Sequence, residues 1–405
     1  MEQSAGLEDG YPNSEGTKEE REKALVLVRE ENVREFVAAC MKTAGLKDSH
    51  ALVQSEVLLD ADRRGKTSHG LQLLDVILAN VQAGTIVNGE PEIMEETSSS
   101  AWVNGRGAPG AVVGMFCMDV AMKKAATNGI GWVSAKGSHH LGALGWYTMR
   151  ACNNGMIGVC MSNTWLATVA PLSKQRALGT NPISFAAPAL DGDYILFDSS
   201  LTVSAMGKIR EALRSGSKHV QAGSGVDQFG VPTQDAETIL FHGGVVPLGG
   251  SSTSTGGHKG FGLLLLVEIL TSVLAGSAFC TDIAKKSAET GAFVGGDFGQ
   301  TFIAIDPAHF GSGFVERMQR LLDYCRQLDR VDESQPVRIP GDQGREHIRR
   351  TEQDGGLWYQ RGLIQRLNAK LETLGGSVEL REVRVQSKQQ GDVTSGTANM
   401  KESSP

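Results

Sequence analysis

Apolar residues recur at helical spacing near the N-terminal end of the chain. Residues 24–29 alternate like a short strand, and helices are expected over residues 32–44, 48–62 and 71–82, where apolar side chains return every three or four positions. Asp48 suits the N-cap of the second helix, because its carboxylate can accept a backbone hydrogen bond. The N-terminal part is therefore predicted to be mainly helical.

The middle of the chain alternates between strand-like and helix-like segments. Helices are expected over residues 111–127 and 143–153, and strands over residues 101–104, 131–135, 156–161, 182–188, 194–198 and 301–305. Such mixing predicts a sheet that is covered by helices on both faces. The most apolar run, residues 261–275, contains Glu268 and is too short to span a bilayer, so it predicts a buried helix.

The last third of the chain returns to helical spacing. Amphipathic helices are predicted over residues 314–328 and 357–374, where leucines recur on one stripe. Residues 1–22 and 386–405 are polar and carry few apolar residues, so we expect both segments to be disordered.

Composition and charge narrow the class of protein. The 405 residues carry a net charge of −7 without a basic stripe, so the electrostatic signature of a nucleic-acid-binding protein is missing. Six cysteines are scattered along the chain without CxxC spacing, which disfavours a disulfide framework or a zinc site. The N-terminal segment lacks the apolar core of a secretory signal, so we expect a cytoplasmic protein without a membrane partner.

One glycine motif suggests a dinucleotide turn but lacks a required partner. Gly105, Gly107 and Gly110 form G-x-G-x-x-G between a predicted strand and a predicted helix. A Rossmann turn also needs an acidic residue at the end of the next strand, where Lys136 and Gly137 stand instead. A plain strand-to-helix turn is the favoured interpretation, and the Rossmann dehydrogenase remains the alternative.

Two histidine segments are candidates for chemistry. His69 lies between Ser68 and Gly70 in a segment dense in cations, which lower an imidazole pKa and suit an anionic ligand; the alternative is a helix cap beside a surface histidine. His139 and His140 follow a strand and precede a helix, where open α/β sheets place ligands. Adjacent side chains point in different directions, so we expect one functional histidine there rather than a metal site.

Backbone N–H groups at a helix start offer a further candidate site. Residues 257–262 open the apolar helix and contain Lys259, and N–H groups together with a lysine suit a phosphate or a carboxylate. The segment is not a Walker motif, because the upstream glycine spacing and the following Ser or Thr are absent.

Five ordered motifs together resemble the malate/L-lactate dehydrogenase family, of the ureidoglycolate, sulfolactate and diketogulonate dehydrogenase type. They span residues 26–349 and comprise residues 61–70, 138–143, 178–188, 198–208 and 259–262. Each motif is weak alone, whereas five in order at similar spacing are specific. The resemblance implies a three-layer α/β/α fold with a mixed sheet, distinct from the Rossmann fold, and a helical domain built from both chain ends.

The resemblance also implies a domain division and an activity. We expect an N-terminal helical part over residues 23–98, a cofactor-binding domain over 99–310 and a C-terminal helical part over 311–385, in a homodimer. The implied reaction moves a hydride between a nicotinamide cofactor and C2 of a small 2-hydroxy or 2-oxo acid. NAD is favoured over NADP, because an acid at Asp342 would disfavour a 2′-phosphate.

The family motifs imply roles for individual residues. His69 and His140 match residues assigned to proton transfer, with Ser68 beside them, while Arg64 and Asn181 are expected to contact the substrate. No metal ligand is expected. The implied cofactor contacts are Thr164, Asp198, Ser199, Ser200, Lys259, Gly341, Asp342 and Gln343.

One position departs from the family pattern. The family usually carries an arginine four residues after the motif histidine, where it can hold the substrate carboxylate, and Leu73 stands there. A leucine cannot replace a fork of charged donors. Either Arg63 or Arg64 substitutes, or the substrate differs, or activity is weakened. The alternative function is therefore a non-catalytic descendant that binds a cofactor or metabolite.

Overall fold

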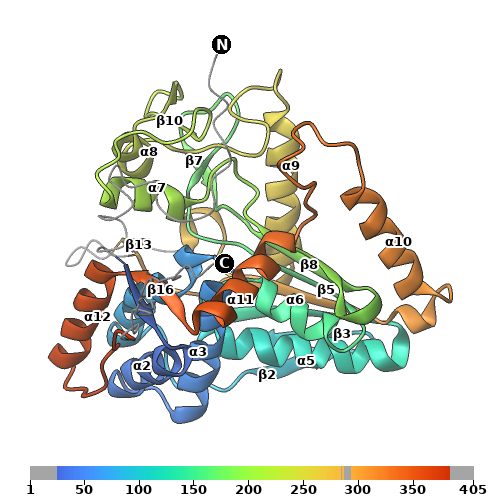
Figure 1. The fold of residues 1–405 in the computed structure, drawn as a ribbon, viewed down its shortest axis with the longest axis horizontal. Helices are drawn as coiled ribbons and strands as arrows, with labels where there is room; N and C mark the ends of the chain where they lie inside the picture. Colours follow the sequence, from blue (N-terminus) through green and yellow to red (C-terminus); the bar gives the residue numbers. More distant parts are fainter. Residues whose placement is uncertain (1–24, 284, 287–292, 384–405) are drawn as a thin grey trace, which may run out of the picture.

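A seven-stranded mixed sheet forms the centre of the protein (Figure 1). The computed structural model describes residues 25–283, 285–286 and 293–383, so both predicted disordered tails lie outside the described residues. β3 and β4 pair in parallel, and the other neighbours pair antiparallel. In spatial order the strands are β2 (Glu92–Glu96), β3 (Ser100–Asn104), β4 (Ile130–Ser138), β15 (Phe298–Ile305), β5 (Ile157–Ser162), β8 (Ile183–Pro188) and β9 (Tyr194–Ser199).

Helices cover both faces of this sheet. On one face, α5 (Gly110–Asn128) and α6 (Gly145–Cys152) share an apolar core with Phe302 of β15. On the other face, α9 (Gly257–Glu268) packs against the next residue of that strand, Ile303. Successive strand residues point to opposite faces, so one strand contributes to both cores. The predicted three-layer α/β/α fold is therefore confirmed.

The two ends of the chain form one helical unit. β1 (Leu25–Val28) pairs antiparallel with β16 (Leu357–Gln360). Behind this pair, four helices share one apolar core: α2 (Glu30–Thr43), α3 (Asp48–Arg63), α4 (Leu74–Gln82) and α12 (Arg361–Thr373). The predicted helical domain from both chain ends is confirmed.

The C-terminal helix is shorter than predicted. Residues 357–360 form β16 instead of the first turn of the helix, which begins at Arg361. Leu357 and Tyr359 are buried on alternate positions, so this short segment has the period of a strand, and pairing with β1 outweighs the helical pattern that follows it. Asp48 likewise begins α3 rather than capping it, because Lys47 holds the N-cap position.

A smaller sheet with two helices was not predicted. Its five strands have two or three residues each, too few to give a periodic pattern. Its strands are β11 (Pro232–Thr233), β10 (Gly225–Val226), β12 (Gly244–Val245), β6 (Thr168–Val169) and β7 (Arg176–Leu178), and its helices are α7 (Met206–Arg214) and α8 (Ala236–Phe241). This unit lies above the main sheet in Figure 1.

Two further helices complete the C-terminal part. α10 (Phe314–Arg326) confirms the predicted amphipathic helix, whereas α11 (Asp342–Asp354) was missed. In α11 the only buried residue is Thr351, so it lacks the apolar stripe by which a helix is found in a sequence.

The apolar helix of residues 261–275 is only half buried in this chain. Leu264 and Val267 are fully enclosed between α9 and the sheet. Leu266, Ile269 and Val273 point away from it and are 46–53% exposed. The prediction of a buried helix is therefore wrong for one face, which the single chain leaves uncovered.

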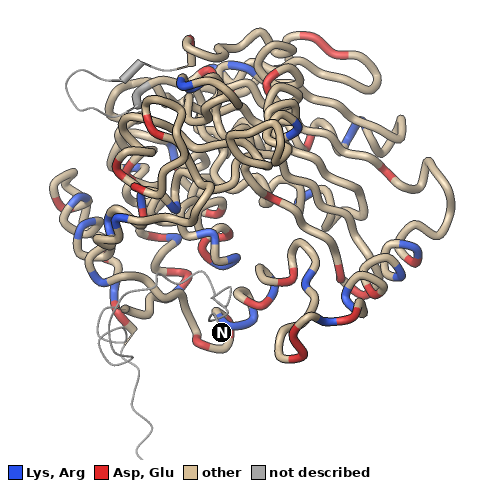
Figure 2. The backbone as a smooth tube through the Cα atoms, turned by 90° about the horizontal axis from the view of Figure 1, so that it is seen from above, with Lys and Arg blue, Asp and Glu red and all other residues tan. Residues whose placement is uncertain are grey.

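Charged residues lie mainly along outer helices and loops, with both signs interspersed (Figure 2). No described helix combines the length and apolar content that a bilayer span requires. The six cysteines are free thiols, and four of them are buried.

Candidate active site

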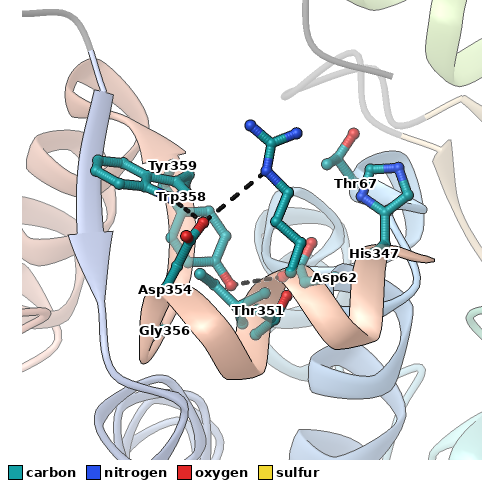
Figure 3. A pocket seen from close by; sticks show the side chains of 11 residues that line it. Asp62, Thr67, His347, Thr351, Asp354, Gly356, Trp358 and Tyr359 are labelled. Carbon is teal, nitrogen blue, oxygen red and sulfur yellow. Dashed lines mark hydrogen bonds and ion pairs between the residues drawn. The ribbon is translucent and has the colours of Figure 1, made fainter. Parts of the chain in front are cut away.

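A buried carboxylate fixes the loop that carries Ser68 and His69. Asp62, in the last turn of α3, accepts a hydrogen bond from the Leu71 N–H at 2.8 Å. It also accepts one from the Tyr359 hydroxyl at 2.8 Å (Figure 3). Gly70 lies directly against this carboxylate, since a Cβ there would fall 1.8 Å from Asp62 Oδ1. Asp62 and Gly70 therefore set the turn on which the intervening residues are presented.

Figure 3 shows a small cavity behind this loop, between α11 and β16. Asp62, Thr67, His347 and Tyr359 line it, whereas neither His69 nor His140 does. Burial raises the pKa of Asp62 to about 7, although the hydrogen bonds from Leu71 and Tyr359 act in the opposite direction. The residues that line the cavity thus stabilise the loop, and the cavity is not the reaction site.

Two histidines from separate segments meet in one place. The ring centroids of His69 and His140 lie 5.7 Å apart, with the rings tilted by 33°. Trp165 stacks beside His140 with a centroid distance of 5.9 Å, and Phe298 packs edge-on against Trp165. The structure therefore brings the predicted histidines together. The aromatic side chains of Trp165 and Phe298 beside them were not predicted from the sequence.

The surroundings of the two imidazoles differ. The Gly142 N–H donates to His140 Nδ1 at 3.0 Å, so the proton of the neutral ring lies on Nε2. Burial, together with the positive charges of His69 and Arg210, lowers the pKa of His140 to about 3.

His69 has a hydroxyl and a carboxylate near it. Ser68 Oγ lies 2.8 Å from His69 Nδ1. Burial lowers the pKa of His69, the charge of Asp198 opposes this shift, and Lys66 and Arg210 add to it. Of the two rings, His69 is thus the one whose protonated form has a compensating negative charge.

His139 points away from this pair. Its Nε2 lies 2.6 Å from the Thr85 carbonyl oxygen, and a Cβ at Gly296 would fall 2.4 Å from the ring. The expectation that the adjacent histidines face different surroundings is confirmed, and His139 has a structural position.

Asp198 connects the His69 loop to the main sheet. Its Oδ2 lies 2.7 Å from Lys66 Nζ and accepts the Gly145 N–H at 2.9 Å. Of the next two residues, Ser199 is exposed and the Ser200 hydroxyl accepts a hydrogen bond from Thr202. The end of β9 is therefore adjacent to the histidine pair.

The half-buried Thr164, next to Trp165, is hydrogen-bonded to the segment that carries Asn181. Thr164 Oγ1 accepts the Thr180 N–H at 2.8 Å. The Asn181 side chain is fully buried and donates to Glu268 Oε2 at 2.6 Å and to the Leu264 carbonyl. The Asn181 amide nitrogen is thus used to hold α9 in place.

The turn of residues 341–343 begins α11. Gly341 has a φ of 104°, which favours glycine, and Gln343 is exposed. The Asp342 carboxylate accepts hydrogen bonds from Arg326 at 2.8 Å and from Arg345. Burial raises the pKa of Asp342, but these hydrogen bonds and that from the Ile339 N–H lower it overall. The predicted preference for NAD relied on the negative charge of Asp342, and Arg326 and Arg345 offset this charge.

The glycines of the motif after β3 pack closely against backbone carbonyl oxygens. A Cβ at Gly105 would fall 2.8 Å from the Gly137 carbonyl oxygen, and one at Gly110 would fall 2.4 Å from those of His139 and His140. These glycines let the turn pack against the backbone of the histidine loop. With the mixed strand order, this contact overturns the Rossmann alternative.

The comparisons with known proteins decide the family. A family model described as malate/L-lactate dehydrogenase matches residues 28–368. The chain belongs to the malate/L-lactate dehydrogenase family. It is 33% identical over 345 residues to a malate/(S)-sulfolactate dehydrogenase of Methanothermus fervidus, covering 84% of this chain and 96% of that protein. It is 31% identical over 306 residues to an NAD(+) ureidoglycolate dehydrogenase of Escherichia coli, covering 75% and 83%.

Solved structures of this family share the fold. Malate dehydrogenase from Pyrococcus horikoshii aligns with a TM-score of 0.79 at 28% identity, covering 88% of this chain and 97% of that one. Sulfolactate dehydrogenase from Methanocaldococcus jannaschii aligns with a TM-score of 0.76 at 29% identity, covering 87% and 98%.

Arg63 and Arg64, which precede the His69 loop, form ion pairs with carboxylates of the protein itself. Arg64 Nε lies 2.8 Å from Asp60 Oδ2, and its NH1 donates to the Tyr194 hydroxyl at 3.3 Å. Arg63 lies 3.2 Å from Glu30 and 3.5 Å from Glu352. Sequence reasoning missed Arg210 of α7, whose charge acts on both histidines, because only the tertiary fold brings α7 to the loop.

Proposed function

We propose that this chain catalyses reversible hydride transfer between NAD or NADP and C2 of a small 2-hydroxy acid. The observation that carries the proposal is the meeting of His69 and His140, 5.7 Å apart between ring centroids, in a chain of this family. Relatives are named as dehydrogenases of malate, sulfolactate and ureidoglycolate, and their names include both NAD(+) and NADP(+).

The residues present fit a nicotinamide dinucleotide. Trp165, stacked beside His140, offers an aromatic surface for a flat ring. Lys259 is exposed in the first turn of α9, where its ammonium group can hold an anion such as a pyrophosphate. The exposed Ser199 hydroxyl at the end of β9 donates to the Ser200 carbonyl oxygen at 3.1 Å, and its oxygen can accept a hydrogen bond from a sugar hydroxyl. We therefore assign cofactor binding to these residues, with Thr164 and the turn of residues 341–343.

The histidines divide the work at the substrate oxygen. When bound, the nicotinamide supplies or accepts the hydride at substrate C2. The His140 ring is neutral, and its Nε2–H can donate a hydrogen bond to the C2 oxygen, which polarises the carbonyl group. Protonation at Nδ1 would cost this ring the hydrogen bond from Gly142, so His140 is a poor proton carrier.

His69 is then the group that moves the proton. Its Nδ1 has the Ser68 hydroxyl at 2.8 Å as a partner, and the charge of Asp198 favours the imidazolium form. In the reducing direction His69 gives its proton to the C2 oxygen, and in the oxidising direction it takes the proton back. General acid–base catalysis of this kind contributes about 10²–10⁴-fold to a rate.

We also propose a homodimer that covers the exposed face of α9 and of the π-helical turn Ile269–Val273 that follows it. Leu263, Leu266, Ile269 and Val273 recur every three or four residues and form one apolar stripe on the side away from the sheet. A twofold contact would pair this stripe with its own copy. Sedimentation of the wild type at micromolar concentration should give a dimer, and Leu266→Asp with Ile269→Asp should give a monomer. A monomeric wild type would contradict this part.

The function is tested with a panel of 2-oxo acids. NADH and NADPH are each mixed with the oxo forms of malate, lactate, sulfolactate and ureidoglycolate, and oxidation of the cofactor is followed by absorbance. Turnover of at least one acid is expected. Cofactor binding by calorimetry without turnover on any acid would favour the non-catalytic alternative, and the absence of both would overturn the proposal.

A further inference from the structure

The carboxylate of a 2-oxo acid is negatively charged, so its binding site should contain a cationic side chain. The family position for that cation holds Leu73, which is 8% exposed and packs in the core of the N-terminal helices. The other cations of the loop have carboxylate partners. Arg63 is held by Glu30 and Glu352, Arg64 by Asp60, and Lys66 by Asp198.

Helix α7 brings another arginine to the same place. Gly207, in its first turn, packs against the loop so closely that a Cβ would fall 2.5 Å from Ser68 Cβ. Arg210 lies three residues further, which places it on the same side of the helix. Ile209 is buried in the core of the smaller sheet, so the orientation of α7 is fixed by that unit.

The guanidinium of Arg210 lacks a carboxylate partner among the described residues. It is exposed to solvent in this chain. Neighbouring atoms still desolvate part of its guanidinium, and this desolvation, together with the charges of Arg214 and Arg176, lowers its pKa. Arg176 itself is committed to carbonyl oxygens at the end of α8, including that of Gly243 at 2.6 Å.

We propose that Arg210 binds the substrate carboxylate, in the role that position 73 has in the family pattern. The inference rests on the proposed function and names its substrate class. A guanidinium can donate two parallel N–H bonds to the two oxygens of one carboxylate. The site then selects acids with an ionised carboxylate bonded to C2 and discriminates against the corresponding amides. The carboxylate anchor comes from the smaller sheet rather than from the N-terminal helices.

Arg210→Met is compared with Arg214→Met, which removes an exposed arginine from the next turn of the same helix. Loss of a charge-assisted, bidentate contact should lower kcat/KM for the 2-oxo acid by about a hundredfold, mostly through KM. The preference for the acid over its amide should fall by a similar factor, and Arg210→Lys should recover part of it. The dissociation constant for NADH should be unchanged, and Arg214→Met should stay within about threefold of wild type.

Oxamate binding separates this inference from the proposed function, because its amide carbonyl is not reduced. Calorimetry with NADH-saturated wild type and Arg210→Met should show loss of oxamate affinity in the variant only, whether or not the wild type turns over. An active wild type with unchanged KM and oxamate affinity in Arg210→Met would overturn the role of Arg210 and leave the function standing. A wild type that neither turns over nor binds oxamate would overturn both.

Discussion

Replacing Asp62 by Asn should change how the stability of the protein depends on pH. Burial raises the pKa of this carboxyl from 3.8 to about 7 in the folded chain. The folded state therefore keeps a proton that the unfolded chain releases. The contribution of Asp62 to the free energy of unfolding is fully present below pH 3.8 and is lost as the pH rises to about 7.

The size of the effect follows from the shift. One pKa unit corresponds to about 1.4 kcal/mol, so the two units between pH 5 and 7 correspond to about 3 kcal/mol. Asn keeps an oxygen that can accept from the Leu71 N–H and the Tyr359 hydroxyl but does not titrate. The stability of Asp62→Asn relative to wild type should therefore increase by up to that amount between about pH 5 and about pH 8.

Urea unfolding of wild type and Asp62→Asn, at one protein concentration and at several pH values in this window, gives the free energy of unfolding of each protein. Asp329→Asn, which replaces an exposed carboxylate outside the loop, is the control and should differ from wild type by the same amount throughout. A difference between Asp62→Asn and wild type that stays constant or decreases with pH would refute the argument.

Three further substitutions test other parts of the account. Gly70→Ala should lower the melting temperature and cut kcat/KM at least tenfold, because a Cβ 1.8 Å from Asp62 Oδ1 must displace the loop; activity equal to wild type would contradict this. Leu73→Arg should lower the melting temperature without raising kcat/KM, because it puts a guanidinium into an apolar core, and a gain in activity would show that this position still faces the substrate. His139→Asn should cost about 1–3 kcal/mol in urea unfolding yet keep kcat within about fivefold, and a loss as large as that of His140→Asn would contradict its structural role.

The parts of the fold that sequence could predict are those with a strong local period. The helices around Val33 and Met118 repeat buried residues every three or four positions, and the strand β15 is a short segment buried on both faces. β16 was missed because its pairing with β1 is a contact between opposite chain ends. The smaller sheet was missed because strands of two residues have no period. The exposed side of α9 could not be distinguished from its buried side, since both carry aliphatic residues: Leu264 and Val267 are buried, and Leu263 and Leu266 are exposed.

The candidate site divides in the same way. His69 and His140 stand in local motifs, so they could be found from the sequence and placed together by resemblance. The hydrogen bond from Tyr359 to Asp62 joins opposite ends of the chain, and no local pattern indicates it. Arg210 carries no motif and reaches the histidines only because α7 packs on Ser68. Long-range contacts of this kind depend on tertiary packing, which periodicity does not encode.

The most direct test of the central claim is the pH dependence of oxo-acid reduction in wild type, His69→Gln and His140→Asn. In the wild type, kcat should fall as the pH rises through the pKa of His69, which burial lowers below its ordinary value of 6.5, because reduction consumes the His69 proton. His69→Gln should lower kcat by about 10²–10⁴-fold and remove this pH dependence, whereas His140→Asn should lower kcat and keep it. A His69→Gln enzyme within about tenfold of wild type, with the same pH profile, would contradict the account.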